Sequence, residues 1–307
     1  MGRSVKTLIW SGISLFFLPS AIFKSLYTKF MNWPDERYMI LHHTAPSKIV
    51  VKVMFSFVWI IFPLQCKHLT VLLELVENNP HEKIMIVGNH LNCGGVQILV
   101  LFLSHLVLTV SLQFKGFDLI FTIWHIYLKT GIYVRAIGDI CHFQLPVWSQ
   151  FLRIWVGSVK GTVENVTLLM ETGQSILLIP GGADEIWKDE RIPPYTLLWK
   201  NRAGFARLSI QYAYKIVPYG IVGFEDMVDI AFSIPAAPFW TFLGDKRALR
   251  NHQPPRELHP TSIAHDLEMR IPVYYPWIRL EKSYLVFGEA VDAGEYSGEL
   301  VYELRNA

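Results

Sequence analysis

Cysteine is scarce in this sequence, and its spacing argues against two classes of site. The three cysteines are Cys66, Cys93 and Cys141, and no two of them have the CxxC spacing of a zinc or redox motif. Three dispersed cysteines do not resemble a disulfide framework either. We therefore expect reduced, buried thiols, which suits a domain that faces the cytosol.

Charged residues are also few, and hydrophobic residues are in excess. Asp, Glu, Lys and Arg make up 18% of the 307 residues, whereas about 25% is usual in a soluble domain, and hydrophobic residues make up 51%. The net charge of +2 and the lack of a basic stripe with interleaved aromatic residues argue against nucleic-acid binding. No metal-ligand spacing is visible, so we expect neither a metal nor a bound cofactor.

The excess of hydrophobic residues lies mostly in the first half of the chain, where two apolar segments precede residue 79. Residues 7–23 contain no charged residue and end in no clean signal-peptide cleavage pattern, which favours a retained membrane segment. Residues 49–64 are somewhat shorter than the roughly 20 residues that cross a bilayer, so a transmembrane helix and a half-inserted hairpin with the first segment are both open. We predict that residues 1–78 anchor the chain to a membrane and that residues 79–307 form an α/β domain.

Apolar runs alternate with helical patterns after residue 79. The predicted strands are residues 84–87, 132–136, 175–179, 215–222 and 284–290, and the predicted helices include residues 158–172 and 201–214. This alternation indicates an α/β fold with a largely parallel sheet and flanking helices. The apolar segment 96–112 is either a buried core helix or a helix that dips into the membrane. With residues 119–128 it would give a hydrophobic surface large enough for long acyl chains.

Two strand ends carry the residues with the clearest chemical potential. His90 follows the strand 84–87, and Gly181-Gly182 with Glu185 follow a later strand. Many α/β enzymes place a reactive side chain in the connection between a strand and the helix that follows it. Two glycines allow backbone amides to approach a phosphate or a developing oxyanion. Taken alone, the same residues are more typical of a structural histidine, a tight turn and a helix-capping carboxylate.

These two stretches occur in order with three further motifs. The motifs are His90 after its strand, Ile179–Glu185 (IPGGADE), Trp199–Ala206 (WKNRAGFA), Ile216–Gly220 (IVPYG) and Phe287–Val291 (FGEAV). Together they resemble the glycerolipid acyltransferases, in particular the branch that holds the type-2 diacylglycerol acyltransferases and the transmembrane protein 68 group. The resemblance covers about residues 82–291. It implies a glycerolipid acyltransferase-like α/β domain, anchored in the membrane of the endoplasmic reticulum and facing the cytosol.

The resemblance also implies a reaction and a set of site residues. His90 would deprotonate the hydroxyl group of a diglyceride or related lipid alcohol, which then attacks the thioester of acyl-CoA. His90 and Glu185 are carried over as catalytic residues. Gly181, Gly182 and Arg202 are carried over as substrate-binding residues, with the Arg202 charge directed at the CoA phosphates. Acyl-CoA is then a co-substrate, and membrane lipid is the second partner.

One feature of the wider family is absent. An Asp a few residues after the His usually orients the imidazole, but its place falls here on Gly95 or Val96. Losing the orienting carboxylate of a comparable triad can lower the rate by about 10⁴. The type-2 diacylglycerol acyltransferases resemble this chain in lacking that Asp. Alternatively, an acidic residue could reach His90 from another strand end, and the candidates are Asp139, Asp184 and Glu185. The third alternative is a catalytically inactive lipid-binding or regulatory protein of the same fold.

A hydrolase is the rival outside this family. Cys93 lies three residues after His90, which would permit a Cys-His nucleophile pair, although a plain buried cysteine is the simpler interpretation. A serine hydrolase of the α/β type would need a GxSxG nucleophile elbow, and the sequence contains none. The sequence therefore favours acyl transfer over hydrolysis.

Overall fold

A computed structural model describes most of the predicted α/β domain and part of the region before it. The described residues are 35–61, 64–90, 117–139, 142–143, 146–182, 185, 188–199, 202–223, 225–227, 229–235, 270–274, 282–296 and 301–306. The predicted apolar segments 7–23 and 96–112 lie outside these residues, as do Cys93, Cys141 and Asp184.

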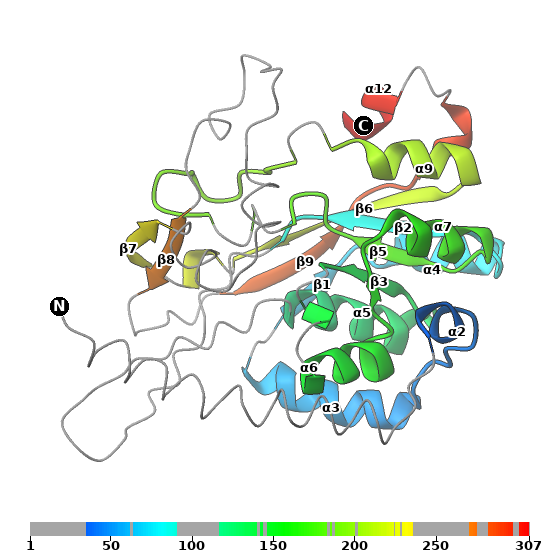
Figure 1. Cartoon of the computed structure of the whole chain (residues 1–307), viewed down its shortest axis with the longest axis horizontal. Coiled ribbons are helices and arrows are strands. Elements are labelled where there is room, and N and C mark those ends of the chain that lie inside the picture. Colours follow the sequence, from blue (N-terminus) through cyan, green and yellow to red (C-terminus); the bar gives the residue numbers. More distant parts are fainter. Residues whose placement is uncertain are drawn as a thin grey trace.

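The centre of the molecule is a mixed, mostly parallel sheet of eight strands (Figure 1). Its order is β1-β9-β6-β2-β5-β3-β4, with β10 also paired to β6. The strands are β1 (Leu64–Lys67), β2 (Ile84–Gly88), β3 (Arg135–Gly138), β4 (Val159–Lys160), β5 (Ile176–Leu178), β6 (Lys215–Val222), β9 (Ser283–Phe287) and β10 (Val291–Asp292). Only β9 and β10 run antiparallel to their neighbour β6. The predicted α/β class with a largely parallel sheet is therefore confirmed.

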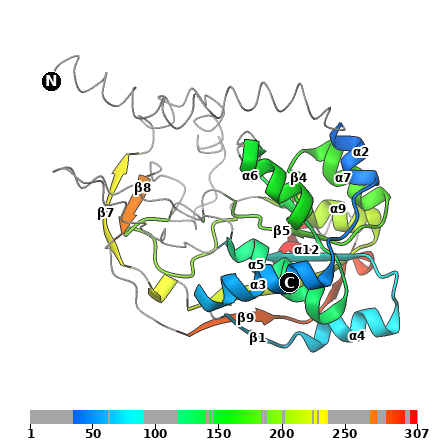
Figure 2. The same cartoon turned by 90° about the horizontal axis from the view of Figure 1, so that it is seen from below.

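Helices cover both faces of the sheet. Their bounds are α2 (Glu36–Leu41), α3 (Lys48–Ile61), α4 (Thr70–Asn78), α5 (Phe117–Thr130), α6 (Pro146–Phe151), α7 (Val163–Glu171), α9 (Gly204–Tyr212) and α12 (Val301–Asn306), and a π-helical turn (Leu152–Val156) follows α6. In Figure 1, α9 and α12 lie on one face and α3 and α5 on the other. A separate two-stranded sheet, β7 (Ile230–Pro235) with β8 (Arg270–Tyr274), lies to one side in both views (Figure 2).

The central strand β2 is buried on both faces, which explains its uninterrupted apolar sequence. Because successive side chains point to opposite faces, Ile84 and Ile86 join the core beneath α5. Met85 and Val87 join the second core beneath α7 and α9. Two hydrophobic cores thus fix the position of the strand that leads to His90.

Helix α5 supplies the interior rather than an open surface. Ile123 and Ile126 are completely buried, and Phe121 and Trp124 are nearly so. The expectation that residues 119–128 contribute a hydrophobic surface for acyl chains is therefore wrong for these side chains. They fill the space between α3 and the sheet, where apolar burial stabilises the fold.

The apolar segment 49–64 forms the short helix α3, which lies along α5. Val51 is completely buried, and the Phe55 ring meets Phe121 edge-on with centroids 5.6 Å apart. On the outer side, Ile49 is 76% exposed and Val53 is 54% exposed. Of the two predicted alternatives, the transmembrane helix is not supported, because no helix among the described residues has the length and apolar character to span a bilayer.

Elements before and after residue 79 contact each other. β1 pairs in parallel with β9, and α2 and α3 contact α7 and α5 respectively. Residues 35–61 and 64–78 are therefore part of the same layered arrangement as the sheet. α2 also contacts the start of β3, where Arg135 donates a hydrogen bond to the carbonyl oxygen of Ile40 at 3.4 Å.

Candidate active site

His90 lies just beyond the carboxyl end of β2, between the ends of β5 and β6. The carboxyl ends of neighbouring parallel strands are the usual location of ligand sites in open α/β sheets. His90 is 8% exposed, so its surroundings are largely shielded from water. His90 therefore lies at a strand end, as the sequence predicted.

Asn89 fastens the segment that carries His90 to the neighbouring strand. Its side-chain amide donates to the carbonyl oxygen of Ile221 at 3.1 Å and accepts from the Ile221 N–H at 2.8 Å. This pair of hydrogen bonds continues the contact between β2 and β6 beyond the last strand pair, Gly88 with Tyr219. A side chain at Gly88 would collide with the Tyr219 ring, because an added Cβ would lie 2.4 Å from it. The only sequence signal for Asn89 was its place beside His90.

Glu185 holds the backbone of His90. Its carboxylate accepts hydrogen bonds from the backbone N–H of His90 at 2.7 Å and from that of Leu198 at 3.0 Å. The side chain is completely buried. Burial raises the pKa of Glu185, while the hydrogen bonds from His90 and Leu198 and the charge of Lys188 act in the opposite direction. Glu185, one of the three acidic candidates, therefore meets His90, and it does so at the main chain.

The two glycines make this contact possible. An added Cβ at Gly181 would lie 2.0 Å from the Glu185 side chain, so only glycine leaves room for the carboxylate. Gly182 has φ of +52°, in the left-handed region that favours glycine, and its N–H donates to the Ile179 carbonyl oxygen at 3.1 Å. The Pro-Gly-Gly turn therefore shapes the space around Glu185.

Arg202 braces the same turn. Its Nη1 donates to the carbonyl oxygens of Pro180 and Gly181, both at 2.6 Å. The predicted contact of Arg202 with CoA phosphates is not tested by this geometry, although one nitrogen of the guanidinium is already engaged by the protein. The turn, Glu185 and His90 are thus linked in one chain of contacts.

A buried ion pair lies beyond Glu185, and no sequence motif indicated it. Lys188 pairs with Glu225, and their side chains are 4% and 7% exposed. Glu225 also accepts a hydrogen bond from the backbone N–H of Tyr195 at 2.6 Å. These contacts fix the position of residues 188–198, and Leu198 in turn donates its backbone N–H to Glu185. Because the paired residues are far apart in the sequence, their spacing could not have revealed them.

Asp139, the other described acidic candidate, follows β3, which is two strands away from β2 in the sheet order. Asp139 is exposed at the end of β3. Cys66 lies in β1, at the opposite side of the sheet order from β3, and burial raises the pKa of its thiol to about 11. In the part of the chain that the structure describes, no three His, Cys, Asp or Glu side chains are grouped as metal ligands.

The similarity to curated proteins is partial. Phytyl ester synthase 1, chloroplastic, from Arabidopsis thaliana is 32% identical over 74 residues, which are 24% of this chain and 10% of that protein. The "DGAT1/2-independent enzyme synthesizing storage lipids" from Bos taurus is 29% identical over 94 residues, 30% of this chain and 27% of the relative. The human protein of that name is 28% identical over 94 residues, 30% of this chain and 28% of the relative.

The matched stretches thus span less than a third of each of these relatives. No family model matches the chain, and no solved structure does. Even so, the resemblance to the glycerolipid acyltransferase branch, which the motifs predicted, is confirmed by these similarities.

Proposed function

We propose that this chain is an O-acyltransferase that moves an acyl chain from acyl-CoA to a glycerolipid or related lipid alcohol, with His90 as the general base. The observation that carries the proposal is the double fixation of the His90 segment at the end of the central strand. Glu185 holds the His90 N–H and Asn89 holds the neighbouring strand. The names of the relatives describe ester synthesis and storage-lipid synthesis, which are both forms of acyl transfer to an alcohol.

The proposed reaction has one attack and one departure. The imidazole of His90 takes the proton of the lipid hydroxyl group, because histidine exchanges protons most readily near neutral pH. The hydroxyl oxygen forms a bond to the thioester carbonyl carbon, and the carbon–sulfur bond breaks. The CoA sulfur leaves as a thiolate and receives the proton from the imidazolium. The products are a lipid ester and CoA.

Glu185 acts in this mechanism as a positioning residue. Its carboxylate contacts the backbone N–H of His90. Glu185 therefore fixes the position of the His90 side chain and does not set the protonation of the imidazole ring directly. Gly181 and Gly182 have a corresponding role, since they leave room for Glu185 and form the turn above it. Arg202 is held against the turn by the two hydrogen bonds from Nη1, and we assign its guanidinium group to the phosphates of CoA, which guanidinium groups bind well.

We also propose that the chain works at a membrane, on the cytosolic side of the endoplasmic reticulum. The support within the described residues is the outer side of α3, where Ile49 and Val53 are exposed next to Lys52. An apolar helix side with a flanking cation is typical of helices that lie in the bilayer interface. Val53→Asp should therefore lower the fraction of the chain that floats with liposomes, whereas Lys83→Asp, at an exposed position before β2, should have a smaller effect.

A catalytically inactive lipid-binding or regulatory protein is the second candidate. The observation that favours it is the absence of an acidic residue at Gly95 and Val96, where the wider family carries its orienting Asp. Membranes from cells that express the chain, supplied with labelled acyl-CoA and a panel of lipid alcohols, separate the two candidates. A labelled ester above the empty-vector background supports the enzyme. A folded, membrane-bound chain that forms no ester with any alcohol supports the inactive protein.

A further inference from the structure

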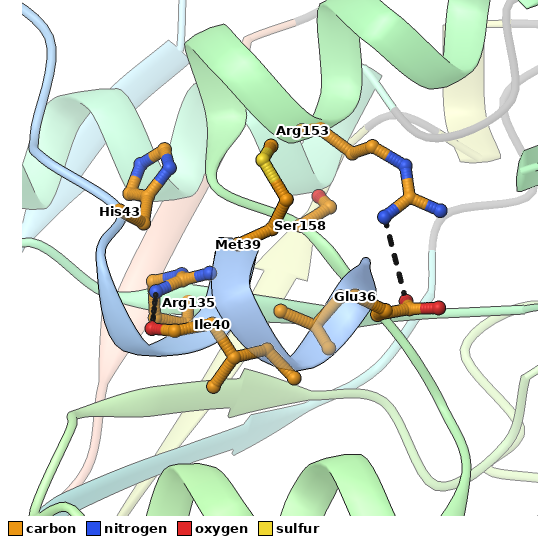
Figure 3. Close-up of a pocket in the computed structure, with 8 residues that line it drawn as sticks. Glu36, Met39, Ile40, His43, Arg135, Arg153 and Ser158 are labelled. Carbon is orange, nitrogen blue, oxygen red and sulfur yellow. Dashed lines mark hydrogen bonds and ion pairs between the residues drawn. The ribbon is translucent and has the colours of Figure 1, made fainter. Parts of the chain in front are cut away.

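A pocket, here called the Arg135 pocket, lies at the other end of the sheet from His90. It is formed between α2, the start of β3 and the segment that joins the π-helical turn to β4 (Figure 3). Arg135 at the start of β3 aligns with Ile176 of β5, which aligns with Met85 of β2. Since a strand rises about 3.3 Å per residue, this level is about 15 Å from His90 along the strand direction. The pocket is therefore distinct from the proposed active site.

The floor of the pocket is a buried arginine with neutral partners. Arg135 is 4% exposed. Its Nε donates to the Gly157 carbonyl oxygen at 2.7 Å, and its Nη1 donates to the carbonyl oxygen of Ile40 at 3.4 Å and to Oε1 of Gln174 at 2.7 Å. The two backbone carbonyls stand at helix ends and supply partial negative charge. None of the three partners supplies a full counter-charge.

The remaining nitrogen of Arg135, Nη2, has no acceptor among the described residues. No described carboxylate forms an ion pair with this arginine either. Burial lowers the pKa of Arg135 only to about 10, so the guanidinium stays charged at neutral pH. A buried charge is costly unless another charge or a set of hydrogen bonds compensates it, and here the compensation is incomplete.

The other walls of the pocket add positive charge and hydrogen-bond donors. Arg153 and Arg135 stand on opposite sides of Met39, and Ser158 lies between them (Figure 3). Glu36 is the carboxylate at this pocket, but it lies 2.7 Å from Lys160 and 3.5 Å from Arg153, so its charge is already shared by two cations.

His43 completes the lining without adding charge. Its Nε2 lies 3.1 Å from the Tyr133 hydroxyl oxygen. Burial and the nearby charge of Arg135 lower the pKa of His43 to about 4, so the ring is neutral at pH 7. The pocket thus keeps a net positive charge, because Arg135 and Arg153 outnumber Glu36 in its lining.

We propose that this pocket binds a small inorganic anion at the guanidinium group of Arg135, with Arg153 and Ser158 as further donors in the pocket lining. The anion supplies the counter-charge that the described protein groups do not give Arg135. Because Arg135 also holds the end of α2, the bound anion stabilises the attachment of α2 to the sheet. A ligand that binds only the folded chain raises its stability by mass action. This site is independent of the proposed acyl transfer.

Thermal unfolding of the purified full chain in detergent tests the site. Sodium gluconate is replaced stepwise by sodium chloride in one series and by inorganic phosphate in another, at constant ionic strength. We expect a saturable rise of the unfolding midpoint with one or both anions, and the series that saturates at lower concentration identifies a halide or an oxyanion. Equal, non-saturating shifts in both series would overturn the proposal.

Variants separate this pocket from general salt effects. Arg153→Gln and Ser158→Ala each remove one donor, and each should raise the half-saturating anion concentration roughly tenfold, as expected for the loss of one hydrogen bond to a charged group. Arg207→Gln changes an exposed arginine of α9 and should leave the titration unchanged. Arg135→Met should abolish the saturable rise.

If Arg135→Met does not fold, the two milder variants still decide the result. Broadening of the chloride NMR line by the unaltered chain gives a direct measure of binding. The broadening should diminish in Arg153→Gln and persist in Arg207→Gln. An identical line width for the unaltered chain and Arg153→Gln would show that the anion does not bind in this pocket.

Discussion

Replacing Glu185 with glutamine tests the proposed positioning role at the contact between Glu185 and the backbone of His90. The completely buried carboxylate accepts one hydrogen bond from His90 N–H and one from Leu198 N–H. Hydrogen bonds to a charged group contribute about 1.5–3 kcal/mol each. Glutamine keeps one acceptor oxygen and turns an NH₂ group toward the other backbone N–H. We therefore expect the free energy of unfolding to fall by about 2 kcal/mol.

The effect on catalysis should exceed what the stability loss explains. A displacement of the base by about 1 Å can lower the rate roughly 100-fold, so we expect kcat of Glu185→Gln to fall by about that factor. The KM for acyl-CoA should change by less than about threefold, because Glu185 contacts His90 rather than the substrate in this mechanism. The assay is ester formation from labelled acyl-CoA, with unfolding in urea measured on the same preparations.

A double variant gives the sharpest readout. If Glu185 acts through His90, Glu185→Gln combined with His90→Ala should be no slower than His90→Ala alone. Glu77→Gln, at an exposed position of α4, is the matched control and should match the unaltered chain in both assays. A kcat within about twofold of the unaltered value, or losses that add in the double variant, would refute the positioning role.

Two further predictions concern the Gly181 turn and the Arg135 pocket. Gly181→Ala should lower the free energy of unfolding by about 1–3 kcal/mol and reduce ester formation, because the added methyl group meets the Glu185 side chain, whereas Gly204→Ala, where nothing lies within 4 Å, should fold as well as the unaltered chain. Below pH 6.5 the unfolded chain takes up a proton on His43 before the folded chain does, because the pKa of this ring is lowered to about 4 in the folded state. Stability should therefore fall as the pH drops from about 6.5 to about 4, by about 1–2 kcal/mol after allowance for solvent screening, and His43→Gln should remove this part of the pH dependence in urea unfolding series at several pH values. An unchanged slope in His43→Gln would contradict the assignment.

The strongest strands were predictable because burial on both faces leaves a continuous apolar run. β2 is observed at Ile84–Gly88 and β6 at Lys215–Val222, close to the predicted ranges. β3 lies at Arg135–Gly138 rather than 132–136. The prediction included Arg135 but ended before Ile137 and Gly138, which pair with Val159 and Lys160 of β4. A partner strand of two residues shows no period, so local apolar periodicity could not place the end of β3.

The predicted start of α7 was wrong because a short strand precedes the helix. The helix predicted from residue 158 begins at Val163, because Val159 and Lys160 form β4 beside β3. Thr162 then caps the helix through a hydrogen bond from the N–H of Asn165 to its side-chain oxygen at 3.3 Å. A strand of two residues is too short to show a period, so only the cap carried a sequence signal.

Which residues form the site was more predictable than which hydrogen bonds connect them. A parallel sheet places the ends of β2 and β5 at one edge, which brings His90 and Glu185 together. The choice of the His90 backbone as the partner of Glu185 depends on the turn at Gly181. Arg202 was expected to face phosphates, and the structure adds two carbonyl groups that no motif encodes.

The measurement that tests the central claim most directly is ester formation by His90→Ala. Purified chain in lipid–detergent micelles is supplied with labelled acyl-CoA and the alcohol that gives the largest product with the unaltered chain. His81→Ala, at an exposed position before β2, is the matched control. Loss of a general base should lower the rate by about 10²–10⁴, so we predict that His90→Ala forms almost no ester while His81→Ala remains fully active. Ester formation by His90→Ala at the rate of His81→Ala would contradict His90 as the base.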